Sequence, residues 1–194
     1  MEVRLLQDEE FANAAGLSRF VFDNCLRMRM DFPQTITFVE EYLKEHHLRE
    51  MKNEGKLLLW GVFENGQMVG VSGMQSDGLI TMLYVLPQCF KRGYGSKLLQ
   101  EMRIYAKDTM KLEKVTVNAT PAFTSYYFKN QGFFPLAQNI SVYVPFVSMF
   151  AKSSDMEIFQ KKHLSNNMIL GAVLGCLGFA TLMCLGYIVY FLLT

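Results

Sequence analysis

Residues 79–107 constrain the fold more than any other part of the chain. They begin with a short apolar run, Leu79 to Val85, that is rich in strand-forming residues and closes at Pro87, which is typical of a buried strand. A helix follows, because apolar residues recur on one face at helical spacing, at Leu98, Leu99, Met102, Tyr105 and Ala106. On the other face we expect polar residues to meet water, namely Lys97, Gln100, Glu101 and Arg103. The stretch predicts a strand, a loop and a helix in succession.

The loop between that strand and that helix contains Lys91, Arg92, Gly93, Tyr94, Gly95 and Ser96. The first backbone N–H groups of a helix have no partner inside the helix, so such a terminus attracts anions. The two glycines carry no Cβ atom that would hold a phosphate away from the backbone, and the two cations add positive charge. The pattern predicts a pyrophosphate site, and the alternative is a tight turn that needs two glycines. It is not a nucleoside-triphosphate P-loop, because G-x-x-x-x-G-K-[ST] is absent, and the dinucleotide pattern G-x-G-x-x-G fails at Leu98.

Three antiparallel strands are expected to lead to this loop. Residues 56–64 and 67–75 flank Asn65-Gly66, and Asn-Gly supplies the two positive φ angles of a type I′ hairpin turn. A turn over residues 76–78 then enters the strand that begins at Leu79.

A first strand at residues 3–6 and two helices are expected before the hairpin. The first helix covers residues 11–30 and ends before Pro33. The second covers residues 37–47, because Thr37 and Glu40 have the spacing of a capping box, and it turns inward Phe38, Tyr42 and Leu43.

One strand, one helix and two further strand segments are expected after the central helix. The strand is residues 114–119, and Thr120 and Pro121 then suit the N-cap and first position of a helix that Gly132 closes at its C′ position. The later strand segments are residues 133–135 and 140–146.

The order of residues around the loop resembles the GNAT superfamily of N-acetyltransferases. In that family a strand ending in Val-x-Pro is followed by the acetyl-CoA loop [QR]-x-x-G-x-[GA], and the positions that fit are Val85, Pro87, Gly93, Gly95, Lys97, Leu98 and Leu99. One position departs from the pattern, since Phe90 stands where the family usually has Gln or Arg. A second part resembles the family's strand and helix ending in F-Y-x-x-x-G-F, in residues 117–121, 126–128 and 131–133. The resemblance covers residues 1–150 and implies an α+β fold with a mixed, mostly antiparallel sheet flanked by helices.

The resemblance implies acetyl transfer from acetyl-CoA to an amine acceptor, with no metal. The pantetheine arm of acetyl-CoA would lie along Leu83, Tyr84 and Val85, and a backbone N–H near Val85 would polarise the thioester carbonyl. The phosphates of acetyl-CoA would be held by Lys91, Arg92, Gly93, Tyr94, Gly95 and Ser96. Asn118 has two interpretations, a contact to the cofactor amides or a turn residue at a strand end. Because Phe90 and Phe128 replace polar family residues, a non-catalytic CoA-binding module at the membrane is the alternative function.

The acid that protonates the leaving thiolate is expected to be a tyrosine hydroxyl. Counting back four residues from Gly132 reaches Phe128, which has no proton to give, whereas counting forward from Pro121 reaches Tyr127. Tyr127 is the favoured acid, Tyr126 or water is the substitute, and core packing is the other role open to these aromatic residues. No general base stands out; candidates are Asp77, Glu40 and Glu41, or bulk water.

The last part of the chain predicts a membrane anchor. The 26 residues from Met168 to Leu193 carry no charge, and as a helix they would be about 39 Å long, enough to cross a hydrocarbon core of about 30 Å. Lys161 and Lys162 precede the span, so we expect a tail-anchored protein with a cytoplasmic catalytic domain and a juxtamembrane linker at residues 151–167. A buried core helix is the alternative. Gly171-x-x-x-Gly175 also suggests a homodimer within the lipid bilayer.

Charge and cysteine content limit the remaining functions. A net charge of +1 leaves no basic field for nucleic acid beyond the loop. Cys25 and Cys89 have no regular spacing, and Cys176 and Cys184 lie within the span, which favours a reducing compartment. Cys89 is more simply an incidental residue than a nucleophile. His46 and His47 are adjacent, point about 100° apart on a helix and therefore do not form a chelating pair.

Overall fold

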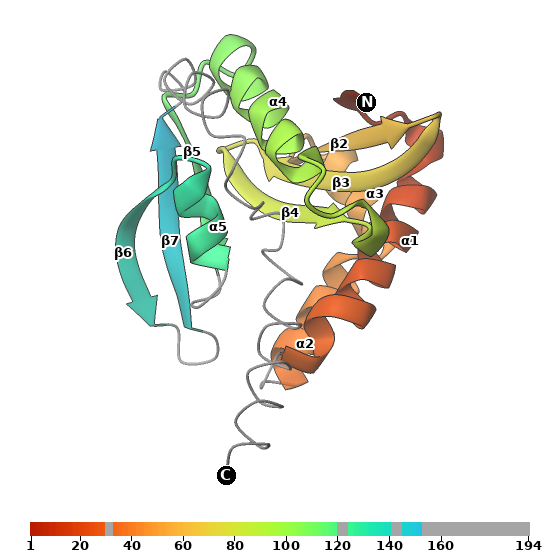
Figure 1. The fold of residues 1–194 in the computed structure, drawn as a ribbon, viewed down its shortest axis with the longest axis horizontal. Helices are drawn as coiled ribbons and strands as arrows, with labels where there is room; N and C mark the ends of the chain where they lie inside the picture. The colour runs from red at the N-terminus through yellow and green to blue at the C-terminus, as the bar shows by residue number, and fades with distance from the viewer. Residues whose placement is uncertain (30–32, 120–123, 141–144, 153–194) are drawn as a thin grey trace.

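A computed structural model describes residues 1–29, 33–119, 124–140 and 145–152 (Figure 1). Within these residues, seven strands form one sheet in the order β1-β2-β3-β4-β5-β7-β6. The strands are Glu2–Leu5 (β1), Leu57–Glu64 (β2), Gln67–Gln75 (β3), Leu79–Val85 (β4), Lys114–Ala119 (β5), Phe134–Ile140 (β6) and Pro145–Lys152 (β7). Neighbouring strands are antiparallel except β4 and β5, which are parallel. The expected mixed, mostly antiparallel α+β fold is confirmed.

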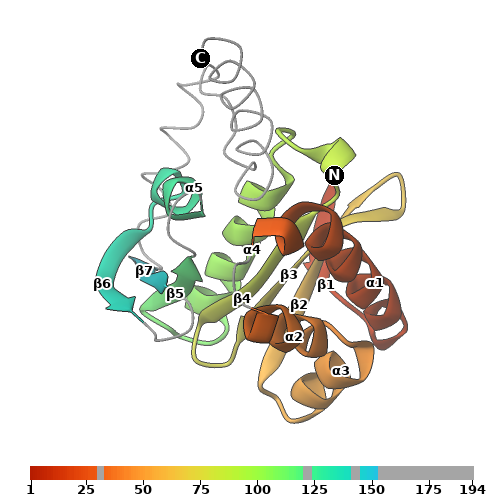
Figure 2. The ribbon, with the colours of Figure 1, turned by 90° about the horizontal axis from the view of Figure 1, so that it is seen from below.

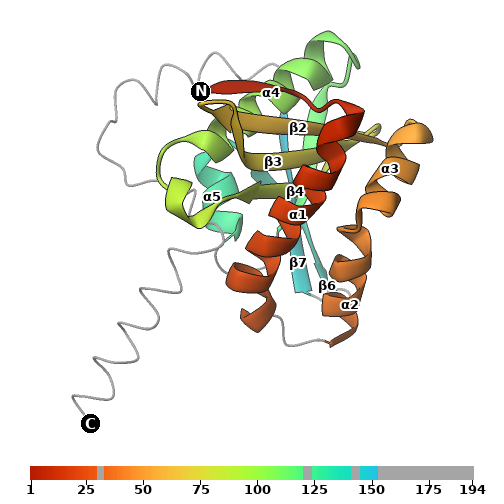
Figure 3. The same cartoon turned by 90° about the vertical axis from the view of Figure 1, so that its right-hand side faces the viewer.

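Helices cover both faces of the sheet, as Figures 2 and 3 show. They are Phe11–Val21 (α1), Pro33–Tyr42 (α2), Glu45–Asn53 (α3), Tyr94–Asp108 (α4) and Thr124–Asn130 (α5). One core, here the α1-side core, joins α1 and α3 to the sheet and includes Phe11, Leu48, Val71 and Met82. The other, the α4-side core, includes Trp60, Leu98, Met102, Val117 and Phe133. The sheet is therefore sandwiched between two apolar layers.

The hairpin and the central helix form as expected. Asn65 and Gly66 have φ angles of 51° and 77°, which are the two positive values of a type I′ turn between β2 and β3. On α4 the apolar stripe is buried, with Leu98, Met102 and Ala106 each 0 % exposed. The hairpin turn and the apolar stripe of α4 each depend on residues that are close in sequence, and both are confirmed.

The capping box expected at Thr37 is wrong. α2 begins at Pro33, whose fixed φ suits a first helical position, so Thr37 lies inside the helix and donates its hydroxyl to the Pro33 carbonyl at 3.2 Å. The helix ends at Tyr42 and α3 starts anew at Glu45, because Lys44 between them has extended backbone. Phe38, expected inward, is 69 % exposed.

The C-terminal strands differ from the expected segments. A single strand over 140–146 is wrong, since Ile140 ends β6 and pairs with Pro145, which begins antiparallel β7. β7 continues to Lys152, so Ala151 and Lys152, placed by sequence in the linker, pair with Val115 and Lys114 of β5. The rest of the linker, Gly171, Gly175 and the span at residues 168–193 lie outside the described residues. Among the residues that are described, no helix combines the length and apolar character needed to span a bilayer.

Arg103 on α4 does not face water as expected but is 4 % exposed. Its Nη1 donates to the Gln131 carbonyl at 3.1 Å and its Nη2 to the Lys152 carbonyl at 3.0 Å. Its guanidinium carbon lies 5.9 Å from the centre of the Phe133 ring. Arg103 therefore joins α4 to the end of α5 and to the end of β7.

We expect Arg103→Met to lower the free energy of unfolding by about 2–4 kcal/mol, because two carbonyls lose their donor in a buried place. Urea unfolding of the purified full chain measures this. Lys107→Met, at an exposed position of the same helix, is the control and should change stability by less than about 0.5 kcal/mol. Equal unfolding midpoints for both variants would contradict the role assigned to Arg103.

Candidate functional site

The centre of the candidate site is an opening between β4 and β5. These parallel strands pair only at Leu79 with Thr116 and at Ile80 with Val117. Beyond those pairs β4 runs on to Val85 and β5 to Ala119, and Figure 1 shows the two strands diverging. The edge of β4 from Thr81 onward therefore has no ladder partner on β5 and could pair with an extended ligand.

A bulge in β4 marks the start of this divergence. In the β3–β4 ladder Gly73 pairs with Met82 and Met74 with Ile80, so Thr81 is an extra residue on β4. A bulge bends its strand and increases its twist, which turns β4 away from β5 at this residue. The Tyr42 hydroxyl donates to Oγ1 of Thr81 at 2.8 Å, and burial raises the pKa of Tyr42. The bulge and its contact to α2 were not visible in the sequence.

The backbone of β4, rather than its side chains, faces the opening. Tyr84 packs in the α1-side core, while Val85 and half-buried Leu83 pack against the α4-side core. The Leu86 N–H donates to the Val69 carbonyl of β3 at 2.8 Å. Because successive N–H groups of a strand alternate between its two edges, the N–H groups of Leu83 and Val85 point toward the opening. Val85 thus has an N–H on the side of the opening, and its role as the donor to the thioester stays a prediction.

The loop before α4 presents a row of backbone N–H groups at the end of β4. Lys91 and Gly93 have φ angles of 60° and 83°, in the left-handed region, and Gly93 is the N-cap of α4. Lys97 makes the first helical bond, to the Gly93 carbonyl at 3.0 Å, and within the described chain no backbone acceptor meets the N–H groups of residues 91–96. A Cβ at Gly93 would meet no atom of the described residues within 4 Å. The described chain thus leaves space beside this donor, which fits a diphosphate.

The charges of this loop are not equivalent. Lys91 is exposed and makes no ion pair with any described residue. Arg92 instead binds the Glu64 carboxylate with both terminal nitrogens, its Nη1 donating to Oε2 at 3.0 Å. The Tyr94 hydroxyl donates to Oε1 of the same carboxylate at 2.6 Å. Arg92 was expected to add free positive charge, and its charge is balanced by Glu64.

The shared carboxylate shifts the pKa of all three groups. The hydrogen bond from Tyr94, followed by contact with Arg92, lowers the pKa of Glu64. Hydrogen bonding to Glu64 raises the pKa of Arg92 and of Tyr94. Glu64 is therefore ionised and Tyr94 neutral near pH 7. The ring of Tyr94 lies in the α4-side core and its hydroxyl binds Glu64, so the group that Tyr94 can offer a ligand is its backbone N–H, beside those of Gly95 and Ser96.

Helix α5 ends in a Schellman motif that fixes two of its aromatic residues. Phe133 donates its N–H to the Phe128 carbonyl at 2.9 Å, and Gly132, with φ of 82°, donates to the Lys129 carbonyl at 3.1 Å. The rings of Phe128 and Phe133 are 5.2 Å apart, the apolar contact that accompanies this motif. Gly132 is confirmed at the C′ position, and Phe128 is a packing residue.

Tyr127 lies in the α4-side core, 4 % exposed, with its ring edge-on to Phe128 at 5.2 Å. The side chain of Tyr126 and the residues Thr120 and Pro121 lie outside what the structure describes. The choice between Tyr127 and Tyr126 therefore stays a prediction. Asn118 is exposed on β5, one residue past the last β4 pair, and is paired with Ser148. It is a strand residue beside the opening rather than a turn residue.

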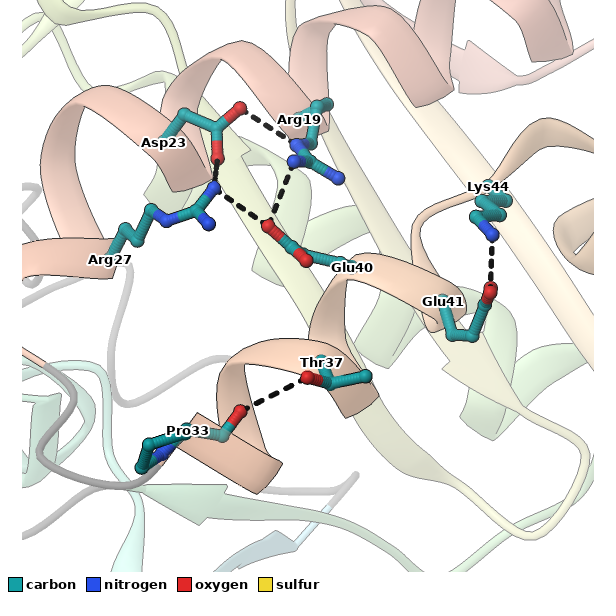
Figure 4. A network of polar contacts seen from close by, with 8 residues as sticks. All are labelled: Arg19, Asp23, Arg27, Pro33, Thr37, Glu40, Glu41 and Lys44. Atoms are coloured by element: carbon teal, nitrogen blue, oxygen red, sulfur yellow. Dashed lines mark hydrogen bonds and ion pairs between the residues drawn. The ribbon is translucent and has the colours of Figure 1, made fainter.

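After α1 ends at Val21, the helix expected over residues 11–30 continues as a π-helix, Phe22–Leu26, and a 3₁₀ helix, Arg27–Arg29. A four-residue ion network joins α1 and these two short helices to α2 (Figure 4). Arg19 binds Asp23 at 2.7 Å and Glu40 at 2.8 Å, and Arg27 binds the same carboxylates at 3.1 and 2.7 Å. Burial of Asp23 raises its pKa, but the hydrogen bonds from both arginines outweigh this and lower it overall. The network balances two cations with two anions.

The three carboxylates considered as general bases already have partners. Glu40 accepts from two guanidinium groups, Glu41 pairs with Lys44, and Asp77 accepts the Leu79 N–H at 3.0 Å. The general base therefore stays a prediction, with these three carboxylates and bulk water as the candidates. The described residues hold no cluster of three His, Cys, Asp or Glu suited to a metal, and Cys89 is buried.

The chain was compared with known proteins. Residues 27–150 match a family model described as "Acetyltransferase (GNAT) domain". A search of the curated proteins finds no match.

Solved structures with a similar fold include three N-acetyltransferases. A GCN5-related N-acetyltransferase from Rhodopseudomonas palustris is 18 % identical, with 78 % of this chain and 94 % of that chain covered and a TM-score of 0.66. The PaiA N-acetyltransferase from Thermoplasma acidophilum, in complex with coenzyme A, is 18 % identical, with 78 % and 98 % covered and a TM-score of 0.62. A variant of a spermidine N-acetyltransferase from Vibrio cholerae is 14 % identical, with 80 % and 96 % covered and a TM-score of 0.57.

At these identities the solved structures support the fold alone, whereas the family model matches more than half of the chain. The chain therefore belongs to the acetyltransferase (GNAT) domain family and is an acyltransferase.

Proposed function

We propose that this protein transfers an acetyl group from acetyl-CoA to a primary amine. The observation that carries the proposal is the pairing of two features at one end of the sheet. Beyond Ile80 the edge of β4 has no ladder partner on β5, and the N–H groups of residues 91–96 meet no backbone acceptor in the described part of the chain. An extended, amide-bearing arm that ends in a diphosphate matches both at once. The Thermoplasma protein of the same fold binds coenzyme A, which supports this choice of donor.

The residues would divide the work as follows. The N–H groups of residues 93–96, with Lys91, hold the diphosphate, and the β4 edge pairs with the amides of the arm. The Val85 N–H points into the opening and would stabilise the negative charge that develops on the thioester oxygen. Asn118 lies on β5, across the opening from β4, and would contact the amides of the same arm.

The reaction would proceed by direct attack. The amine nitrogen forms a bond to the acetyl carbonyl carbon, the carbon–sulfur bond breaks, and coenzyme A leaves as a thiolate. The proton lost by the attacking nitrogen passes to water. The thiolate, with a pKa of about 8.5, takes a proton from a tyrosine hydroxyl with a pKa of about 10 or stays hydrogen-bonded to it. Tyr127 is our favoured donor and Tyr126 the substitute.

Glycine 93 provides a test of the phosphate site. We expect Gly93→Asp to weaken coenzyme A binding at least about 100-fold, because a carboxylate would stand against the phosphates. Gly93→Asn is the matched control, since Asn has nearly the same shape and accepts left-handed backbone as readily. Gly93→Asn should weaken coenzyme A binding much less than Gly93→Asp does. Isothermal titration of the full chain with coenzyme A measures both affinities. Similar dissociation constants for the two variants would show that the phosphates do not bind at Gly93.

The reaction itself is tested by turnover of acetyl-CoA over a panel of primary amines, with mass spectrometry detecting a gain of one acetyl group. Spermidine belongs on the panel because a protein of the same fold acts on it. With the amine that reacts, Tyr127→Phe should leave coenzyme A affinity unchanged and lower kcat about 10-fold or more. Tyr105→Phe is the control, because Tyr105 packs edge-on to Trp60. Tight coenzyme A binding without turnover on any amine would instead favour the non-catalytic CoA-binding module.

We also propose that residues 168–193 tether the enzyme to a membrane, with the acyltransferase domain on the cytoplasmic side. The basis is the uncharged 26-residue run that follows Lys161 and Lys162. The wild-type chain should stay in the membrane pellet after carbonate extraction, whereas a chain that stops at residue 167 should be released. Release of the wild-type chain would contradict the proposed membrane anchor, and with it the homodimer suggested by Gly171 and Gly175.

A further inference from the structure

Glu64 is a charged residue to which the proposed reaction assigns no part, yet it contacts the cofactor loop twice. It is the last residue of β2 and pairs with Gln67 across the Asn65-Gly66 turn. Its carboxylate binds the guanidinium of Arg92 and the hydroxyl of Tyr94, which follow it by 28 and 30 residues. The tip of the β2–β3 hairpin is therefore fastened to the start of α4.

Both partners of Glu64 stand inside the row of proposed phosphate donors. Arg92 lies between Lys91 and Gly93, the two residues with left-handed backbone, and Tyr94 is the first residue of α4. The guanidinium of Arg92 also lies 5.3 Å from the centre of the Tyr94 ring. Holding these two side chains fixes the direction of the backbone between them, and this backbone carries the donors.

The geometry also decides what Arg92 does. Its two terminal nitrogens are directed at one carboxylate, the forked arrangement in which Arg binds most selectively. Nearby, Lys91 is exposed and without an ion pair among the described residues. Lys91 can therefore meet a phosphate directly, whereas Arg92 is already committed to Glu64 and neutralises it.

We propose that Glu64 is a positioning residue for the diphosphate site, acting through Arg92 and Tyr94 to hold the 91–96 loop in its ligand-ready form. This inference rests on the proposed function, since it takes coenzyme A as the ligand of that loop. A loop that is already ordered loses less conformational entropy when the ligand binds, so the ion pair raises affinity without touching the ligand. The opposite arrangement would have Glu64 compete with the phosphates for Arg92.

The two arrangements predict opposite results for Glu64→Gln, measured by titration of the full chain with coenzyme A. If Glu64 positions the loop, the variant should bind about five-fold more weakly, the size expected from an exposed ion pair. If Glu64 competes for Arg92, the variant should bind more tightly. Glu54→Gln is the matched control, because it removes an exposed ion pair with Lys56 before the other end of β2, and it should bind like the wild type.

Two further measurements separate positioning from a general loss of structure. Pantetheine lacks the diphosphate, so its affinity, followed by ligand-observed NMR, should be the same for wild type and Glu64→Gln. In an Arg92→Gln background, Glu64→Gln should weaken coenzyme A binding little further, because Glu64 acts largely through Arg92. Unchanged or tighter coenzyme A binding by Glu64→Gln, or equal losses for both ligands, would overturn the inference. A wild-type chain that binds no coenzyme A would instead overturn the proposed function.

Discussion

The departure of β4 from β5 is the constraint on which the rest of the structure depends. It begins at the extra residue Thr81 and divides the sheet into one part formed by β1 to β4 and another formed by β5, β7 and β6. Two half-sheets that share two residue pairs cannot be held together by their ladder alone. A common apolar layer must join them, and the α4-side core does so, because it takes residues from β2, β3 and β4 as well as from β5 and β7.

Helix α4 therefore has two tasks that are linked. Its apolar stripe packs against both half-sheets, with Leu98, Met102 and Ala106 fully buried. Its N-terminus lies at the end of the opening between them and presents the donors of residues 93–96. Polar contacts tie the helix to both half-sheets: Tyr94, its first residue, binds Glu64 of β2, and Arg103, in its second half, binds the last residue of β7. The helix that joins the halves is thus also the helix that holds the proposed ligand.

What could be predicted from the sequence was local. The type I′ turn at Asn65-Gly66, the stripe on α4 and the cap at Gly132 each depend on a few neighbouring residues, and all three are found. Thr37 and Glu40 show how a local pattern fails, because Pro33 starts the helix earlier and Glu40 pairs with two arginines from earlier in the chain, Arg19 and Arg27. The bulge at Thr81 left no mark in the sequence, since it arises from the pairing of β3 with β4.

The charges available to a ligand also differ from those counted in the sequence, because the partners of these charges lie far away along the chain. The sequence predicts a ligand contact for Arg92 and leaves Glu40 as one of three candidate general bases, because a charge read along the chain has no visible partner. In the folded protein Glu64 neutralises Arg92, and Arg19 with Arg27 occupies Glu40. What remains to attract an anion at the loop is the row of backbone N–H groups at the start of α4, aided by Lys91. Such donors are fixed by the backbone, so they need no rearrangement when the anion arrives, and their aim depends on whatever holds that backbone in place.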